Sequence, residues 1–302
     1  MVSKTAPVVE SYLAPLPLLL AGWLPFWAGT LLAMVSGYPL RTMVLLYGSL
    51  GVALLILAAF AGREIFAPGA GRYPAWKLAP LPGSTLTGEK ARLNHILFYI
   101  LLGLAAAYAL DLQFFYHTGV LTIPLGALGV LGGYFCFAPP LAWHRRGLGE
   151  VAGGFCFGLL PMLTGFYLQS GYWVAEELFY GLPLTFAGFN LFLIYGFPDP
   201  KGEAPRCGSL AARWGPVPVA LIYTAGNLLI MLLIVGLFYF PASPLPFRAF
   251  LWPLLVLAVV NQELLKRRAY REKGRLQLLC RLSLALHLGM GAVFCLMLWQ
   301  RL

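Results

Sequence analysis

Two carboxylates stand in a short polar segment, residues 197–206, between two long apolar stretches. Asp199 and Glu203 are four residues apart, and Lys201 and Arg206 accompany them. The chain is 60% hydrophobic and only 11% charged, and acids near a membrane are rare and costly. Carboxylates at a membrane face can hold Mg²⁺, which binds oxygen ligands that it shares with a phosphate substrate. These residues therefore predict Mg²⁺-assisted chemistry on a phosphate group.

A third acid lies where an earlier apolar stretch ends. Arg63 and Glu64 close that stretch, as Asp199 closes the later one. If the two ends share a cavity, Glu64 joins Asp199 and Glu203 as a metal ligand, and Arg63 becomes available to a phosphate. Mg²⁺ and the cations would together assist the departure of diphosphate from an allylic carbon. The alternative is that each acid is a solvated loop end, balanced by an adjacent Arg or Lys.

A third polar segment, residues 137–150, connects two further apolar stretches. Its Pro-Pro pair ends a helix, and the two glycines near its end permit a tight return. Between them, Arg145 and Arg146 can reach a phosphate. The alternative is a simple basic turn, with Glu150 near the positive end of the following helix.

Apolar runs of about 20 residues recur along the 302-residue chain, and the mean hydropathy is +0.79. Runs of this length are typical of membrane-spanning helices. The sequence predicts nine spans, of which the eighth is the shortest: Leu13–Ser36, Thr42–Gly62, Leu93–Leu112, Gly119–Pro139, Val151–Ser170, Leu178–Phe197, Val217–Phe240, Phe247–Gln262 and Leu279–Trp299. No segment between spans exceeds about 30 residues, so no separate soluble domain is expected.

The positive charges follow the predicted spans in a regular pattern. The net charge is +10, and 17 of the 21 Lys and Arg residues follow even-numbered spans. This bias places the N-terminus and the even connections in the cytoplasm. The clustering argues against a nucleic-acid partner and for contact with membrane lipid. We expect an all-α membrane protein with nine transmembrane helices around a central cavity, a cytoplasmic N-terminus and a multi-pass location in the cytoplasmic (inner) membrane.

Several of these segments resemble a known family. Residues 139–150 read P-P-L-A-W-H-R-R-G-L-G-E, which is similar to the loop P-P-L-x-x-x-x-R-G-L-G-E of the UbiA superfamily of intramembrane prenyltransferases. The spacing of Asp199 and Glu203 resembles the family's second acidic motif, D-x-x-x-D, and residues 209–215 resemble the T-L-A-x-x-L-G run that follows it. The similarity is greatest to the branch that prenylates 1,4-dihydroxy-2-naphthoate for menaquinone.

The resemblance implies both an architecture and a reaction. Residues 1–302 would form one polytopic domain of two four-helix pseudo-repeats and a ninth helix. The protein would move a polyprenyl group from a diphosphate donor to an aromatic acceptor in menaquinone- or ubiquinone-type quinone biosynthesis. Glu64, Asp199 and Glu203 would be the catalytic residues and the Mg²⁺ ligands. The diphosphate would be contacted by Arg63, Arg145, Arg146, Lys201 and Arg206.

The sequence departs from the family at several motif positions. When Glu64 takes the first acid of the motif N-D/E-x-x-D, Ala67 stands at the second acid. Cys136 stands where the family has tyrosine, and Ala142 where it has a basic residue. The family holds two Mg²⁺ ions with about four or five acids, and with three acids available either one ion or two remain possible. The alternative function is a catalytically degenerate relative that binds isoprenoid or quinone, or acts as a partner subunit.

The remaining polar residues inside the spans are few. Asn190, Asn227, Asn261 and Gln262 either line a pocket for the acceptor or hydrogen-bond between helices. The five cysteines show no metal-ligand spacing and are expected to be small buried hydrophobes. A transporter would need ionisable residues along a buried pathway, and the spans contain almost none.

Overall fold

The computed structural model describes residues 16–66, 89–198, 209–239 and 245–302, except for the side chains of residues 64, 89–91 and 245–248. These residues form helices and contain no strand, so the predicted all-α fold is confirmed. The helices are α2 (Leu16–Val35), α3 (Thr42–Phe66), α4 (Glu89–Leu110), α5 (Thr122–Phe137), α6 (Trp143–Arg146), α7 (Gly149–Phe157), α8 (Leu159–Ser170), α9 (Glu176–Tyr195), α10 (Leu210–Trp214), α11 (Pro216–Tyr239), α12 (Leu245–Lys266) and α13 (Lys273–Trp299). A π-helical turn, η1 (Asp111–Phe115), extends α4, and a 3₁₀ turn, η2 (Ala269–Arg271), joins α12 to α13.

Each of the nine predicted spans contains helix. Eight helical segments of the described chain are long and apolar enough to cross a membrane, and the protein is therefore a multi-pass membrane protein. The eighth prediction was too short, because α12 continues to Lys266 and reaches 22 residues; a lysine can lengthen a span since its charged end reaches the interface. The shortest of the nine is instead the fourth, α5, an apolar helix of 16 residues.

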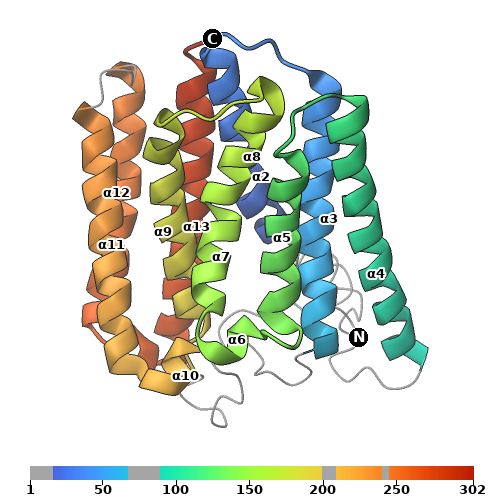
Figure 1. Cartoon of the computed structure of the whole chain (residues 1–302). Coiled ribbons are helices and arrows are strands. Elements are labelled where there is room, and N and C mark those ends of the chain that lie inside the picture. Colours follow the sequence, from blue (N-terminus) through green and yellow to red (C-terminus); the bar gives the residue numbers. More distant parts are fainter. Residues whose placement is uncertain (1–15, 67–88, 199–208, 240–244) are drawn as a thin grey trace, which may run out of the picture.

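The long helices stand side by side and alternate in direction (Figure 1). The short helices α6 and α10 and the turn between α12 and α13 lie at one end of the bundle, and the C-terminus lies at the other (Figure 1). We call the first of these the basic end, because its connections carry Arg145, Arg146, Arg213, Arg268 and Arg271. The predicted clustering of positive charge on one side of the membrane is therefore present in the structure.

The helices α2 and α8 cross with their backbones in contact. A Cβ atom on Gly29 would collide with the carbonyl of Met162, and a Cβ atom on Gly165 would collide with the carbonyl of Phe26. The two contacts are reciprocal, since Gly165 and Met162 each lie 136 positions after the corresponding residue of α2. The sequence Leu-Pro-x-x-x-Gly occurs at 24–29 and again at 160–165. Small residues allow such close approach of membrane helices.

The proline of the first copy of this repeat changes the hydrogen bonding around the crossing. Proline has no N–H, so Pro25, inside α2, leaves the carbonyl of Ala21 without its usual helical donor. His287 of α13 donates from Nε2 to the Ala21 oxygen over 3.2 Å and lies beside the Phe157 carbonyl. One imidazole therefore contacts the carbonyl that Pro25 exposes and also lies beside the last residue of α7.

Amide side chains join the helices of the second half. Asn190 of α9 donates to the carbonyl of Tyr223 in α11 over 3.2 Å. Asn227 of α11 donates to the carbonyl of Ala258 in α12 over 2.8 Å, and it also donates to the side chain of Gln262 over 3.3 Å. The sequence left open whether these amides line an acceptor pocket or hydrogen-bond between helices. For Asn190, Asn227 and Gln262 the structure shows hydrogen bonds between helices.

Candidate functional site

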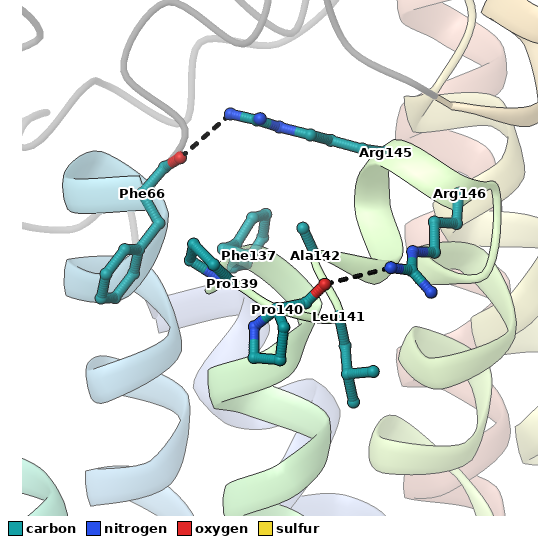
Figure 2. A pocket seen from close by; sticks show the side chains of 8 residues that line it. All are labelled: Phe66, Phe137, Pro139, Pro140, Leu141, Ala142, Arg145 and Arg146. Atoms are coloured by element: carbon teal, nitrogen blue, oxygen red, sulfur yellow. Dashed lines mark hydrogen bonds between the residues drawn. The ribbon is translucent and has the colours of Figure 1, made fainter.

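A pocket of about 270 Å³ opens at the basic end. One wall is apolar and combines the last residue of α3 with the connection that follows α5, whereas the other wall carries two arginines (Figure 2). The lining residues are Phe66, Phe137, Pro139, Pro140, Leu141, Ala142, Arg145 and Arg146. A pocket with an apolar wall and a cationic wall suits a molecule that has an anionic group on an apolar body.

The arginines are held by a tight turn. The helix α5 ends at Phe137, before a cis Pro-Pro peptide bond. Left-handed residues bracket the four-residue helix α6, with φ of 40° at Ala142 and 74° at Gly147. Glycine adopts this conformation readily, so the predicted role of Gly147 in a tight return is confirmed.

Both guanidinium groups donate to backbone carbonyls at the pocket. Arg145 Nη2 points to the oxygen of Phe66 at 3.5 Å, across the gap to α3 (Figure 2). Arg146 Nη2 donates to the oxygen of Pro140 over 3.1 Å. Both side chains are exposed, so their remaining N–H groups can meet a ligand from the solvent side.

Hydrogen bonds connect the arginine turn, residues 143–146, to the residues that directly follow the acidic segment, residues 197–206. Glu150, in the first turn of α7, accepts a hydrogen bond through Oε1 from the N–H of Leu210 over 2.9 Å. Arg213 of α10 donates to the carbonyl of Arg146. Ser209 caps α10 by accepting from the N–H of Ala212 and donates from Oγ to the carbonyl of Gly196 over 2.8 Å. Two connections at the basic end that are far apart in the sequence are thus joined.

The structure confirms one expectation for Glu150 and adds to it. Glu150 lies in the first turn of α7, near the positive end of that helix, as the sequence suggested. Its carboxylate also accepts from the N–H of Leu210, 60 positions further along the chain. The residue pattern does not mark this contact, because its donor is a backbone N–H. The one sequence signal nearby is Ser209, a residue type favoured at helix N-caps.

The end of α3 faces the same region. Arg63 lies in the last turn of α3, and both Arg63 and Glu150 lie within electrostatic range of the Cys136 thiol at the end of α5. The partly buried His144 donates from Nδ1 to the carbonyl of Cys136 over 2.8 Å. Burial lowers the pKa of His144 below its ordinary value of 6.5, and the charges of Arg145 and Arg63 lower it further against that hydrogen bond. The ends of α3, α5 and α7 therefore converge.

The structure brings together three of the eight predicted site residues, Arg63, Arg145 and Arg146. For Glu64 it describes the backbone at the end of α3 and not the side chain. Asp199, Lys201, Glu203 and Arg206 lie outside the described residues, between Pro198 and Ser209. Within the described part of the chain, no group of three His, Cys, Asp or Glu residues could hold a metal ion. The predicted Mg²⁺ ligands therefore stay a prediction.

Solved structures with the same fold are known. A UbiA homolog from Aeropyrum pernix K1 has a TM-score of 0.65 at 17% identity, covering 91% of this chain and 96% of that one. A structure of digeranylgeranylglyceryl phosphate synthase gives 0.64 at 14% identity, covering 97% and 99%. A UbiA homolog from Archaeoglobus fulgidus bound to DMAPP and Mg²⁺ gives 0.60 at 15% identity, covering 94% and 99%. At these identities the likeness concerns the fold.

The sequence itself matches a family model, that of the UbiA prenyltransferase family, over residues 77–298. A search among curated proteins finds no match. The matched range includes the arginine turn, the acidic segment and helices α4 to α12. It confirms the resemblance seen in the sequence and the expected class of enzyme, a prenyltransferase. The chain belongs to the UbiA prenyltransferase family.

Proposed function

We propose that this protein transfers a polyprenyl group from a diphosphate donor to an aromatic acceptor at its basic end. The observation that carries the proposal is the joining of two segments: the arginine turn at 143–146 is bonded, through Glu150 and Arg213, to the helix that follows the acidic segment. The arginine turn is thereby attached to the residues that follow the segment carrying Asp199 and Glu203, which supports one site formed by both. The long apolar helices offer surroundings suited to the polyprenyl chain.

The cations take the diphosphate. Arg145 and Arg146 stand at the pocket with exposed guanidinium groups, which form charge-assisted hydrogen bonds to phosphate oxygens. Arg63 lies at the end of α3 on the same side. Lys201 and Arg206, in the acidic segment, complete the proposed set. Spread over three segments, these charges hold the donor with its allylic carbon toward the apolar helices.

Glu64, Asp199 and Glu203 would hold Mg²⁺. Carboxylate oxygens are suitable ligands for this ion, and Glu64 belongs to the helix end that the Arg145 side chain reaches at Phe66. The structural relative from Archaeoglobus fulgidus is bound to DMAPP and Mg²⁺. Bound here, the ion would neutralise charge on the departing diphosphate. Three acids are compatible with one ion, and a second would need more ligands or water.

The acceptor and the cellular setting follow from the similarity of the arginine segment. We place the protein in the branch that uses 1,4-dihydroxy-2-naphthoate, in quinone biosynthesis at the cytoplasmic membrane. The repeated Leu-Pro-x-x-x-Gly and the reciprocal crossing of α2 and α8 support one domain of two four-helix pseudo-repeats and a ninth helix. The pseudo-repeats would meet around a shared cavity.

A turnover assay tests the proposal. The purified protein in lipid nanodiscs is given prenyl diphosphates of several lengths, Mg²⁺ and 1,4-dihydroxy-2-naphthoate, and the prenylated product is measured. We expect turnover that requires Mg²⁺ and is abolished in Asp199→Asn. Glu263→Gln is the matched control, because Glu263 is an exposed acid near the basic end that pairs with Arg267 at 2.9 Å. Absence of turnover with every donor, or full activity in Asp199→Asn, would reject the proposal.

One observation favours a second candidate, a degenerate relative that binds isoprenoid or quinone. Ala67 stands in place of the first motif's second acid, and Cys136 replaces the family's tyrosine between Arg63 and Glu150. Such a protein would retain a lipid or quinone through purification, and EDTA would not release it. The same preparation distinguishes the candidates by mass spectrometry of the bound lipid with and without Mg²⁺.

A further inference from the structure

Glu150 is a buried acid with an incomplete set of hydrogen bonds. Its side chain is 5% exposed. Oε1 accepts from the N–H of Leu210, whereas Oε2 has no hydrogen-bond partner within the described residues. Burying a carboxylate costs free energy unless the group is paired and hydrogen-bonded. The one hydrogen bond that Glu150 makes to Leu210 joins two segments that are far apart in the sequence.

Both ends of the acidic segment lie against this carboxylate. On the upstream side, a Cβ atom on Gly196 would lie 3.2 Å from Glu150 Oε1 and 3.0 Å from Ser209 Cβ, so only a residue without a side chain fits easily. On the downstream side are Leu210, which donates to Glu150, and Ser209, which donates to the Gly196 carbonyl. The chain therefore leaves α9 and enters α10 at nearly the same point, and Glu150 stands at that point.

The same contact reaches the arginine turn. Glu150 follows Arg146 by four positions, and Gly147 between them packs against the Leu210 side chain, where a Cβ atom would lie 2.8 Å from Leu210 Cδ2. Arg213 then donates to the Arg146 carbonyl. Moving Glu150 would therefore change the spacing between the arginines and the entrance and exit of the acidic segment.

We propose that Glu150 is a positioning residue that sets the distance between the arginine turn and the two described flanks, Gly196 and Leu210, of the segment that carries Asp199 and Glu203. The inference rests on the proposed function, because it assigns those two segments to one diphosphate site. Glu150 acts through the N–H of Leu210. This role requires only an acceptor oxygen at the end of a side chain long enough to reach that N–H. Glutamine has the same side-chain length and supplies such an oxygen without the charge.

A second buried glutamate serves as a matched control. Glu177, in the first turn of α9, is 0% exposed; its Oε1 accepts from the N–H of Val174 over 3.0 Å, and its Oε2 has no partner among the described atoms. The first turn of α9 lies at the opposite end of the bundle from α6 and α10 (Figure 1). Glu177→Leu therefore removes a similar buried carboxylate without touching the proposed site.

The experiment compares Glu150→Gln, Glu150→Leu and Glu177→Leu in nanodiscs. The KM for the prenyl diphosphate should stay within a factor of two or so in Glu150→Gln and rise by about tenfold or more in Glu150→Leu, as expected when binding groups shift by about 1 Å. Glu177→Leu should lower the melting temperature and leave that KM unchanged. Because KM requires turnover, amide hydrogen exchange of peptides covering residues 196–215 is measured in parallel.

The exchange measurement separates the two ideas. Faster exchange in these peptides in Glu150→Leu alone supports the positioning role even if no turnover is found, in which case the proposed function fails by itself. Equal exchange and equal KM in Glu150→Leu and wild type would overturn the inference. It would also be overturned if Glu150→Gln were as impaired as Glu150→Leu, since that would assign the role to the charge or proton of Glu150 and not to its reach.

Discussion

The imidazole of His287 should be energetically coupled to a proline on another helix. Pro25 leaves the Ala21 carbonyl without a helical donor, and His287 Nε2 supplies one over 3.2 Å. In His287→Leu that carbonyl loses its donor, and a buried unsatisfied carbonyl costs roughly 1–3 kcal/mol. In Pro25→Ala the new N–H at position 25 can bond to Ala21, so the loss of His287 should cost less.

The expected coupling follows from the strength of one hydrogen bond. Between membrane helices such bonds average about 0.6 kcal/mol and reach about 1.7 kcal/mol. Pro25→Ala supplies a new backbone N–H to the Ala21 carbonyl, which His287→Leu otherwise leaves unsatisfied. We therefore expect the unfolding free energy lost in His287→Leu to be smaller by about 1 kcal/mol in the Pro25→Ala background. Any effect of removing the proline ring itself cancels in the double-mutant cycle.

The assay is reversible unfolding of the four variants in mixed micelles. Pro253→Ala serves as control partner, because Pro253 also lies inside a helix, α12, and its side chain is exposed. That pair should show no coupling with His287→Leu. A coupling between His287 and Pro25 below about 0.3–0.5 kcal/mol, the range found for independent sites, would refute the view that His287 substitutes for the missing helical donor.

Three further predictions concern packing, polar groups and pH. Gly165→Val should prevent assembly of the α2–α8 crossing, whereas Gly51→Val, which meets nothing within 4 Å, should not, as size-exclusion profiles will show. Asn261→Leu should stabilise the protein or leave it unchanged in unfolding assays, because the buried amide has no partner among the described atoms, whereas Asn227→Leu should lower the unfolding free energy by about 1 kcal/mol. The unfolded chain protonates His144 near pH 6.5 and the native one at lower pH, so stability should fall as pH drops below 6.5, and His144→Gln should weaken this trend in thermal melts.

Much of the fold could be predicted because a membrane limits the choices. Apolar runs long enough to cross it must be helical, and this places helix in every predicted span. What the pattern could not predict is the break in the fifth span, where α7 ends at Phe157 and α8 begins at Leu159. Hydropathy does not change there. The break depends on Gly158, whose ψ of −91° is not helical. It also depends on a hydrogen bond in which the N–H of Leu159 donates to Thr185 Oγ1.

The site was predictable where single side chains carry the chemistry, and less so where contacts join distant segments. Arg145 and Arg146 stand out as cations beside a Pro-Pro turn, and the structure places both at a pocket. The partner of Glu150 is a backbone N–H at Leu210, and no residue type marks such a donor in a sequence. The proline and glycine repeat was visible, but its meaning became clear only when Gly29 and Gly165 were seen to contact each other's helix.

The repeat bears on why the predicted acids occur where they do. A shift of 136 positions relates α2 to α8, and the same shift carries Glu64, at the end of α3, to position 200, next to Asp199 beyond the end of α9. If the shift found for α2 and α8 extends to the next helices, the two acid-bearing helix ends are counterparts, and a local two-fold relation at the α2–α8 crossing would bring counterparts to the same end of the bundle. That relation supports a diphosphate site built from both halves. With Ala67 in the first half, the second half must supply most of the carboxylates, so losing Asp199 should impair Mg²⁺-dependent turnover more than losing Glu64.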